Sequence, residues 1–76
     1  MDSLGMLETT GLTPAVAALD AMEKTAGVRL LQAEVNDMLG ICFKIQGAPD
    51  AVTLALEAGH ELAATLGGQP VKASIN

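Results

Sequence analysis

Few residues of this chain have the type and spacing that chemistry would require. Glu57, His60 and Glu61 include the i, i+3 carboxylate–histidine spacing of metal sites in helical bundles, but such sites need matching ligands from other helices. All three fall on the polar arc of one predicted helix, which favours a solvated surface. Cys42 lies in a predicted strand and is best explained as a small packing residue. We find no nucleophile paired with a base, no glycine-rich phosphate cradle and no zinc spacing, so the sequence predicts no enzyme, no metal and no cofactor.

The composition limits the classes of protein to which this chain could belong. The 76 residues suffice for one small domain, and a content of 50% hydrophobic and 17% charged residues predicts a folded chain. Phe43 is the single aromatic residue, so the core must be built from smaller side chains, and a thin core favours stabilisation by association. The net charge of −5 argues against nucleic acid as a partner. No membrane span or signal peptide is recognisable and one cysteine fits a reducing compartment, so we expect a cytoplasmic protein without a membrane partner.

The elements that must position these residues begin with a strand over residues 3–9, which Thr10 and Gly11 interrupt. Thr13 before Pro14 predicts the start of a helix that runs to about Thr25, with the threonine as its cap. Gly27 then supplies a left-handed residue. Residues 28–35 alternate, which predicts a strand with one face of Arg29, Leu31, Ala33 and Val35 and another of Val28, Leu30, Gln32 and Glu34.

The second half repeats the pattern. Asn36 and Asp37 predict a tight turn into another strand, whose two faces are Leu39, Ile41, Phe43 and Ile45 against Gly40, Cys42, Lys44 and Gln46. Pro49 and Asp50 predict the start of a second helix, which runs to about Leu66 before two glycines. Its apolar arc is interrupted by one misplaced large residue, Leu54. Residues 71–75 predict a last strand.

This order, βαββαβ, predicts an α+β fold of the split βαβ, ferredoxin-like type, in which two helices cover one face of a four-stranded antiparallel sheet. The other face then has no cover. Its predicted strands carry too few charges for a face permanently in water, so we expect part of the sheet or its edge to meet another subunit.

Two segments of the chain resemble a known family. Gly5-Met6-Leu7-Glu8-Thr9-Thr10-Gly11-Leu12 is similar to the "G-M-I-E-T-x-G-L" opening of the bacterial microcompartment (BMC) shell domain, and Ala18-Leu19-Asp20-Ala21-Met22-Glu23-Lys24-Thr25-Ala26-Gly27-Val28 to its "A-A-D-A-M-x-K-A-A-x-V" helix. Further matches are Gly47 with Asp50-Ala51-Val52, and Glu57-Ala58-Gly59. The resemblance covers nearly the whole chain and implies that residues 1–76 form a single BMC shell domain of the unpermuted form.

The family resemblance implies a structural role. Single-domain members form flat cyclic hexamers that tile the polyhedral shell around a set of enzymes, and a central pore passes metabolites. By resemblance, Lys24 lies at the hexamer edge and packs against a neighbouring hexamer, although an ordinary helix lysine is simply solvated. The implied partners are copies of this chain, other shell proteins and the encapsulated enzymes, and the implied location is the microcompartment shell in the cytoplasm.

Two departures from the family pattern concern the pore and the tiling. Where members carry "K-I-G-S-G", this chain has Val35-Asn36-Asp37-Met38-Leu39-Gly40, so the pore-lining candidates are Asn36, Asp37, Met38 and Leu39. Six copies of Asp37 at a six-fold axis would raise one another's pKa or recruit a cation, whereas six copies of Met38 would form an apolar plug. Equally, Asn36 and Asp37 would serve as a plain hairpin turn. The chain also lacks the family's "x-P-R-P-H" segment after the last strand, which makes tiling less secure than ring formation.

The competing class of function is a small regulatory module of the same ferredoxin-like fold, which would dimerise through its sheet and bind a ligand at the subunit edges. The segment Glu8-Thr9-Thr10-Gly11 and the later Asp20-Ala21-Met22-Glu23-Lys24 favour the shell domain, because a regulatory module has no reason to carry them.

Overall fold

The computed structural model describes residues 2–36 and 40–75 and confirms the predicted order of elements. In chain order these are β1 (Ser3–Thr10), α1 (Leu12–Glu23), β2 (Val28–Val35), β3 (Gly40–Gly47), α2 (Pro49–Thr65) and β4 (Val71–Ile75). The described part is a flat body with extents of 33 × 22 × 15 Å.

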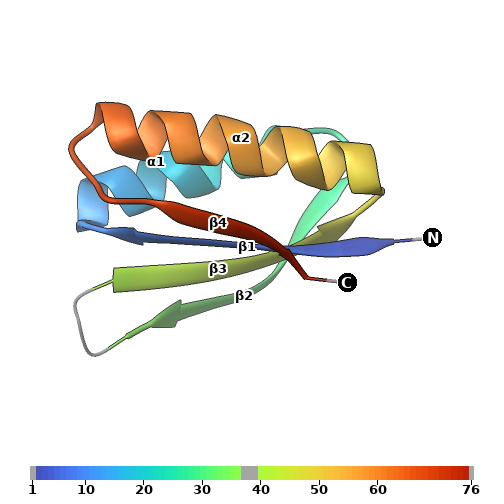
Figure 1. The fold of residues 1–76 in the computed structure, drawn as a ribbon, viewed down its shortest axis with the longest axis horizontal. Coiled ribbons are helices and arrows are strands. Elements are labelled where there is room, and N and C mark those ends of the chain that lie inside the picture. The colour runs from blue at the N-terminus through green and yellow to red at the C-terminus, as the bar shows by residue number, and fades with distance from the viewer. Residues whose placement is uncertain (1, 37–39, 76) are drawn as a thin grey trace.

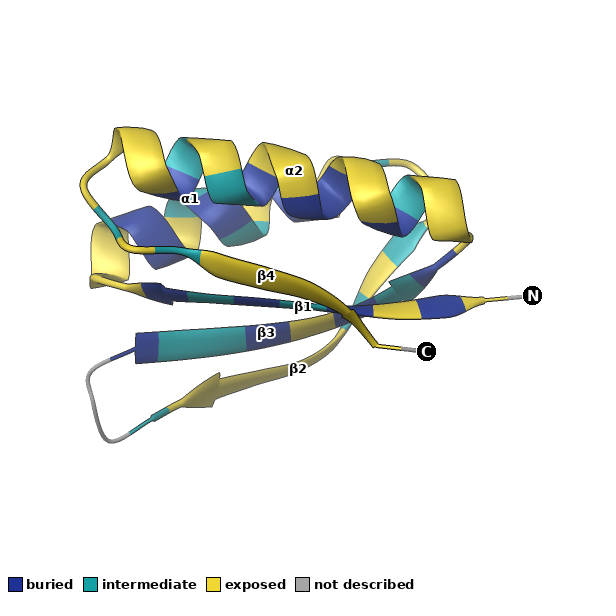
Figure 2. Ribbon diagram, in the orientation of Figure 1, coloured by how far each residue is buried: buried dark blue, intermediate teal, exposed yellow. Residues whose placement is uncertain are grey.

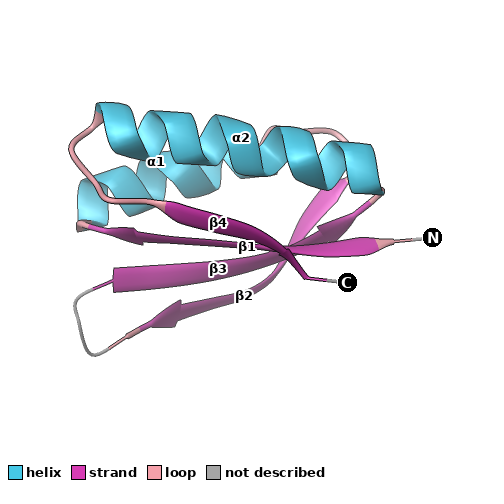
Figure 3. Cartoon of the chain, in the orientation of Figure 1, coloured by secondary structure: helices cyan, strands magenta, loops and turns pink. Residues whose placement is uncertain are grey.

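The strands form one sheet in the order β2-β3-β1-β4, and every neighbouring pair is antiparallel. Helices α1 and α2 lie side by side on one face of this sheet, and no helix of the described residues covers the other face (Figures 1 and 3). The predicted split βαβ fold is therefore confirmed. This strand order puts β1 and β3 in the middle of the sheet and leaves β2 and β4 at its two edges.

The core lies between the central strands and the two helices. Leu7 and Phe43 face each other across β1 and β3 in register, and both are buried. They meet a set of aliphatic helix residues that are also buried, namely Ala15, Ala18, Met22, Val52, Ala55, Leu56 and Ala63. Because most of these side chains are small, the helices and the sheet approach closely, which compensates for the shortage of aromatic residues.

Two glycines make that close approach possible. A Cβ atom at Gly59 in α2 would lie 2.9 Å from Cγ of Met22, and one at Gly5 in β1 would lie 2.7 Å from Cγ1 of Val52. Contacts this short would force neighbouring side chains to move. The absence of a side chain at these positions therefore fixes how α1, α2 and β1 pack.

The start of α1 differs from the sequence prediction. The helix begins at Leu12 and its N-cap is Gly11, so Thr13 is the second helical residue and does not hold the capping position. Gly11 has φ of +84°, a left-handed conformation that lets the chain leave β1 and turn directly into the helix. The helix also ends at Glu23, two residues earlier than predicted, whereas Gly27 takes the predicted positive φ of +82°.

The start of α2 agrees with the sequence prediction. Pro49 lies in the first turn of the helix, and Asp50 is an acidic residue in that turn, where it interacts favourably with the helix dipole. Leu54 is exposed, as its place in the polar arc predicts.

Strand β2 contains an irregularity that the alternation in the sequence did not predict. Leu30 pairs with Ile45, but the next registered pair is Gln32 with Lys44, so Leu31 is an extra residue in a β-bulge. As a result, the residues after the bulge change sides. Ala33 and Val35 lie on the helix side with Val28 and Leu30, and Arg29, Gln32 and Glu34 share the open face. The predicted division of this strand into two faces was therefore wrong beyond Leu30.

Candidate functional site

The open face of the sheet is polar toward one end. Register places Glu8, Cys42 and Glu34 in one row across β1, β3 and β2. The next row holds Met6, Lys44 and Gln32. A concave region of about 470 Å³ lies over these rows and over the end of β2. The face thus combines two carboxylates and one ammonium group with a thiol between the carboxylates.

Cys42 is partly exposed at the centre of this row. Burial raises the pKa of its thiol above the ordinary value, the negative charge of Glu8 raises it further, and that of Glu34 adds to the effect, while Lys44 opposes it. A thiol that holds its proton is a weak nucleophile and a weak metal ligand. Cys42 is therefore poorly suited to nucleophilic or metal chemistry, and its role as a packing residue stays a prediction.

The β2–β3 connection carries the candidate pore residues. The backbone N–H of Asn36 donates to the carbonyl of Gly40 at 2.9 Å, and the backbone N–H of Gly40 donates to Oδ1 of Asn36 at 2.9 Å. Nδ2 of Asn36 donates to the Glu8 carboxylate in β1. Asn36 therefore closes the mouth of the hairpin. Asp37, Met38 and Leu39, the other candidate pore residues, lie outside the described residues.

Both edge strands of the sheet are exposed along most of their length, as Figure 2 shows. On β2, the side chain of Val35 is 71% exposed and that of Leu31 is 47% exposed. On β4, the exposed large apolar residues are Val71 and Ile75. Edge strands offer unpaired backbone groups, and with apolar side chains they are surfaces that proteins normally cover.

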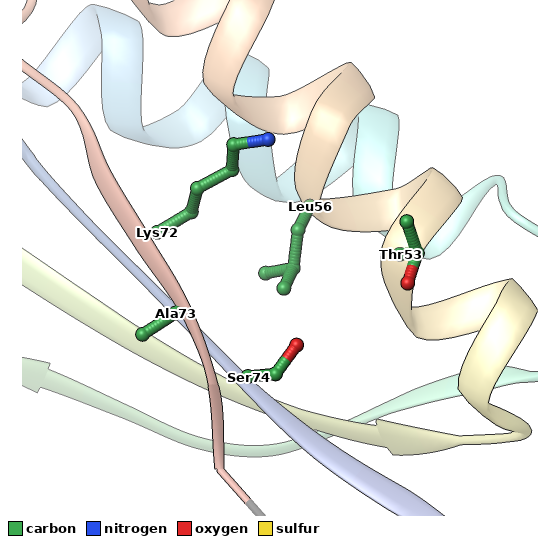
Figure 4. A pocket seen from close by; sticks show the side chains of 5 residues that line it. All are labelled: Thr53, Leu56, Lys72, Ala73 and Ser74. Carbon is green, nitrogen blue, oxygen red and sulfur yellow. The ribbon is translucent and has the colours of Figure 1, made fainter.

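A groove of about 200 Å³ runs between β4 and α2. Figure 4 shows Leu56 and Thr53 reaching into it from the helix, with Lys72 and Ser74 on the strand side. Because Lys72 and Ser74 are exposed, this edge combines an apolar floor with hydrogen-bond donors at its rim.

Lys24, the candidate residue of the hexamer edge, lies just after the last residue of α1 and is exposed. Its Nζ forms an ion pair with Asp20 one helical turn earlier, at 2.8 Å. The hydrogen bond to Asp20 raises the pKa of Lys24, and the charge of that carboxylate adds to the effect, so the side chain is an ammonium at neutral pH. The ion pair with Asp20 thus fixes the Lys24 side chain on the surface beside α1.

The described residues contain no group of three His, Cys, Asp or Glu side chains that could hold a metal ion. Glu57 and Glu61 are exposed on α2, and His60 between them is half-buried. In residues 2–36 and 40–75, no helix is long and apolar enough to cross a bilayer.

Two features of this site were not predicted from the sequence. The sequence carries no local signal for the bulge at Leu31. Leu30 and Leu31 are both apolar, so an alternating pattern can be continued from either of them. The contact between Asn36 and Glu8 joins residues 28 positions apart, and only the register β2-β3-β1 brings them together. The short turn signal at Asn36 was the one clue to its importance.

Comparisons with known proteins place these features in a family. The model of the BMC domain matches residues 3–75. Carboxysome shell protein CsoS1A of Hydrogenovibrio crunogenus is 40% identical over 73 residues, which cover 96% of this chain and 76% of the relative. Carboxysome shell protein CsoS1 of Prochlorococcus marinus is equally identical, with 71% of its length covered.

A crystal structure of a microcompartment protein from Desulfitobacterium hafniense superimposes with a TM-score of 0.80 at 32% identity. The match covers 93% of this chain and 41% of that one, so the present chain corresponds to less than half of that protein. The relatives are named as shell proteins, which supports a structural rather than an enzymatic role. By sequence and by fold, the chain belongs to the BMC-domain family.

Proposed function

We propose that this chain is a structural protein of a bacterial microcompartment shell, in which it forms cyclic hexamers that tile with other shell proteins. The observation that carries the proposal is the pair of exposed sheet edges, each with large apolar side chains, on a chain of this family. The flat shape of the described body suits a tile, since its thinnest extent is 15 Å.

The two edges suit a ring because they differ from each other. Edge β2 offers a bulged strand with Leu31 and Val35, whereas edge β4 offers a groove against α2 and the residues Val71 and Ile75. A contact between unlike surfaces of identical subunits is heterologous, and such contacts close into rings when the rotation permits. Edge β2 of one subunit would thus meet edge β4 of the next.

Under this proposal the β2–β3 connection approaches the six-fold axis. Asn36, Asp37, Met38 and Leu39 would then form the wall of the central opening in place of the Gly-Ser-Gly backbone of other members. Either six carboxylates or six thioethers would converge there. Both arrangements give an opening that is more acidic or more occluded than one lined by neutral backbone.

The proposed partners are further shell hexamers and the encapsulated enzymes, and the proposed location is the shell of a microcompartment in the cytoplasm. With a charge of −5 per chain, six chains carry about −30 in a ring. Rings of like charge repel one another at low ionic strength, so their association would require defined edge contacts and would depend on salt. Lys24, exposed beside Asp20, is the proposed contact between rings.

Size-exclusion chromatography with light scattering, followed by negative-stain imaging, tests the proposal. We expect a mass near six times 7.7 kDa and particles with six-fold symmetry. A dimer that binds a metabolite would instead favour the regulatory module, and a chain that stays monomeric at high concentration would exclude both. For the pore, conductance or crystallography of the ring should show an acidic or occluded opening, and an open, neutral one would contradict this part of the proposal.

A further inference from the structure

We propose that Asn36 is a positioning residue, whose side chain ties the mouth of the β2–β3 hairpin to Glu8 on the central strand β1. Its amide group donates to the Glu8 carboxylate while its Oδ1 accepts the backbone N–H of Gly40. One side chain thus joins three strands. The inference deepens the proposed function, because the connection held in this way is the one proposed to line the opening of the ring.

The register explains why this contact crosses a whole strand. Glu8 pairs with Cys42 and Thr10 pairs with Gly40, so the side chain of Asn36 must pass over β3 near Gly40 to reach β1. A Cβ atom at Gly40 would lie 2.8 Å from Nδ2 and 3.1 Å from Oδ1 of Asn36. The open path therefore depends on a glycine at position 40. Asn36 and Glu8 also line the concave region of about 470 Å³ on the open face and a second one, of about 180 Å³, that Thr10 and Val71 border.

The chemistry of the pair defines what replacements it will accept. An amide donor that meets a carboxylate gives a charge-assisted hydrogen bond, which is stronger than one between neutral groups. An aspartate at position 36 would keep the acceptor for Gly40 but would bring a second negative charge against Glu8. A glutamine at position 8 would restore complementarity, because its amide could donate to that aspartate. Two substitutions together can therefore exchange the donor and the acceptor of this hydrogen bond and keep the contact.

Hydrogen exchange of the Gly40 amide, followed by NMR, reports on the tether directly. Asn36→Ala should increase its exchange rate about tenfold, equivalent to about 1.4 kcal/mol, whereas the amide of Ile45 in the middle of β3 should be unaffected. Asn36→Asp should increase the rate at least threefold. Glu8→Gln alone retains a carbonyl acceptor and should change the rate less than threefold.

The decisive measurement is the double variant Asn36→Asp with Glu8→Gln. Return of the Gly40 exchange rate to within threefold of the wild-type rate would support the tether, because a general loss of stability would not be repaired by a second substitution. Equal rates in the double variant and in Asn36→Asp would overturn the inference, as would an unchanged rate in Asn36→Ala.

The mass in solution separates this inference from the proposed function. Exchange at Gly40 is measured on the wild-type chain in whatever state it adopts, so a chain that forms no hexamer would contradict the ring while the tether is still tested. A hexamer in which these substitutions leave the Gly40 exchange rate unchanged would contradict the tether but not the proposed ring.

Discussion

The most informative substitution is Val35→Ala at the β2 edge. The side chain of Val35 is 71% exposed in the single chain, and in the proposed ring it would be covered by the β4 edge of the next subunit. Truncation to alanine removes apolar volume equivalent to about two methylene groups, each worth about 0.8 kcal/mol when buried. Scaled by the exposed fraction of 71%, the loss is about 1.1 kcal/mol for each contact.

The ring multiplies this loss. Six identical contacts lose about 7 kcal/mol together, which changes the equilibrium constant for dissociation of the ring into six chains by about 10⁵. The dissociation constant scales with the fifth power of the total chain concentration at which half of the rings are dissociated. That midpoint concentration should therefore rise about tenfold in Val35→Ala. Mass photometry or sedimentation velocity over a dilution series measures this midpoint.

The matched control is Val16→Ala on α1. Val16 is also a valine and is 58% exposed, but it lies on neither edge of the sheet, so its truncation should move the midpoint less than twofold. Circular dichroism must show that both variants remain folded. If Val35→Ala and Val16→Ala dissociate at the same concentration as the unmodified ring, the β2 edge is not the contact and the reasoning fails.

Further predictions concern tiling, thiol reactivity and packing. Lys24→Ala should abolish sheets in electron micrographs while hexamers persist, whereas Asp20→Ala, which removes the ion-pair partner of Lys24, should leave sheets intact; unchanged sheets in the lysine variant would contradict the edge role. Because folding raises the pKa of Cys42, its contribution to stability is complete below the unfolded pKa of about 8.5 and is lost as the pH rises through the folded value. Iodoacetamide should accordingly modify the native chain at pH 8 more slowly than the urea-unfolded chain, and equal rates would refute this. Gly47→Ala places a Cβ atom 2.2 Å from the backbone oxygen of Gly27 and should cost about 3 kcal/mol in urea unfolding. Gly67→Ala meets no atom within 4 Å but must keep φ of +91°, so it should cost only about 1 kcal/mol; similar losses for both would contradict this ranking.

Much of the fold could be predicted because the local signals agree with one another. Phe43 and Ile45 were predicted to share one face of a strand and are both buried on its helix side, and Pro49 begins α2 because proline suits the first turn of a helix. Prediction failed at Thr13, where a strong capping residue lies one position inside the helix. There the left-handed Gly11 had already turned the chain, which local propensity at Thr13 does not reveal.

The candidate site was harder to predict than the fold because it depends on contacts between distant segments. The family motifs predicted a contact between rings at Lys24, which stays a prediction; the structure shows the side chain exposed and paired with Asp20. No local pattern links Asn36 to Glu8, since their contact requires the strand order and a glycine at position 40.

The single extra residue at Leu31 has a consequence for the polarity of this outer strand. If Leu31 stayed in the strand without a bulge, strict alternation would turn Gln32 and Glu34 toward the helix layer and bring Ala33 and Val35 to the face that holds Glu8, Cys42 and Lys44. The bulge takes up the second of two adjacent leucines, so the polar side chains that follow keep their place on the open face. Deleting Leu31 would straighten the strand and leave this division of polar and apolar sides unchanged, because Gln32 would then follow Leu30 directly.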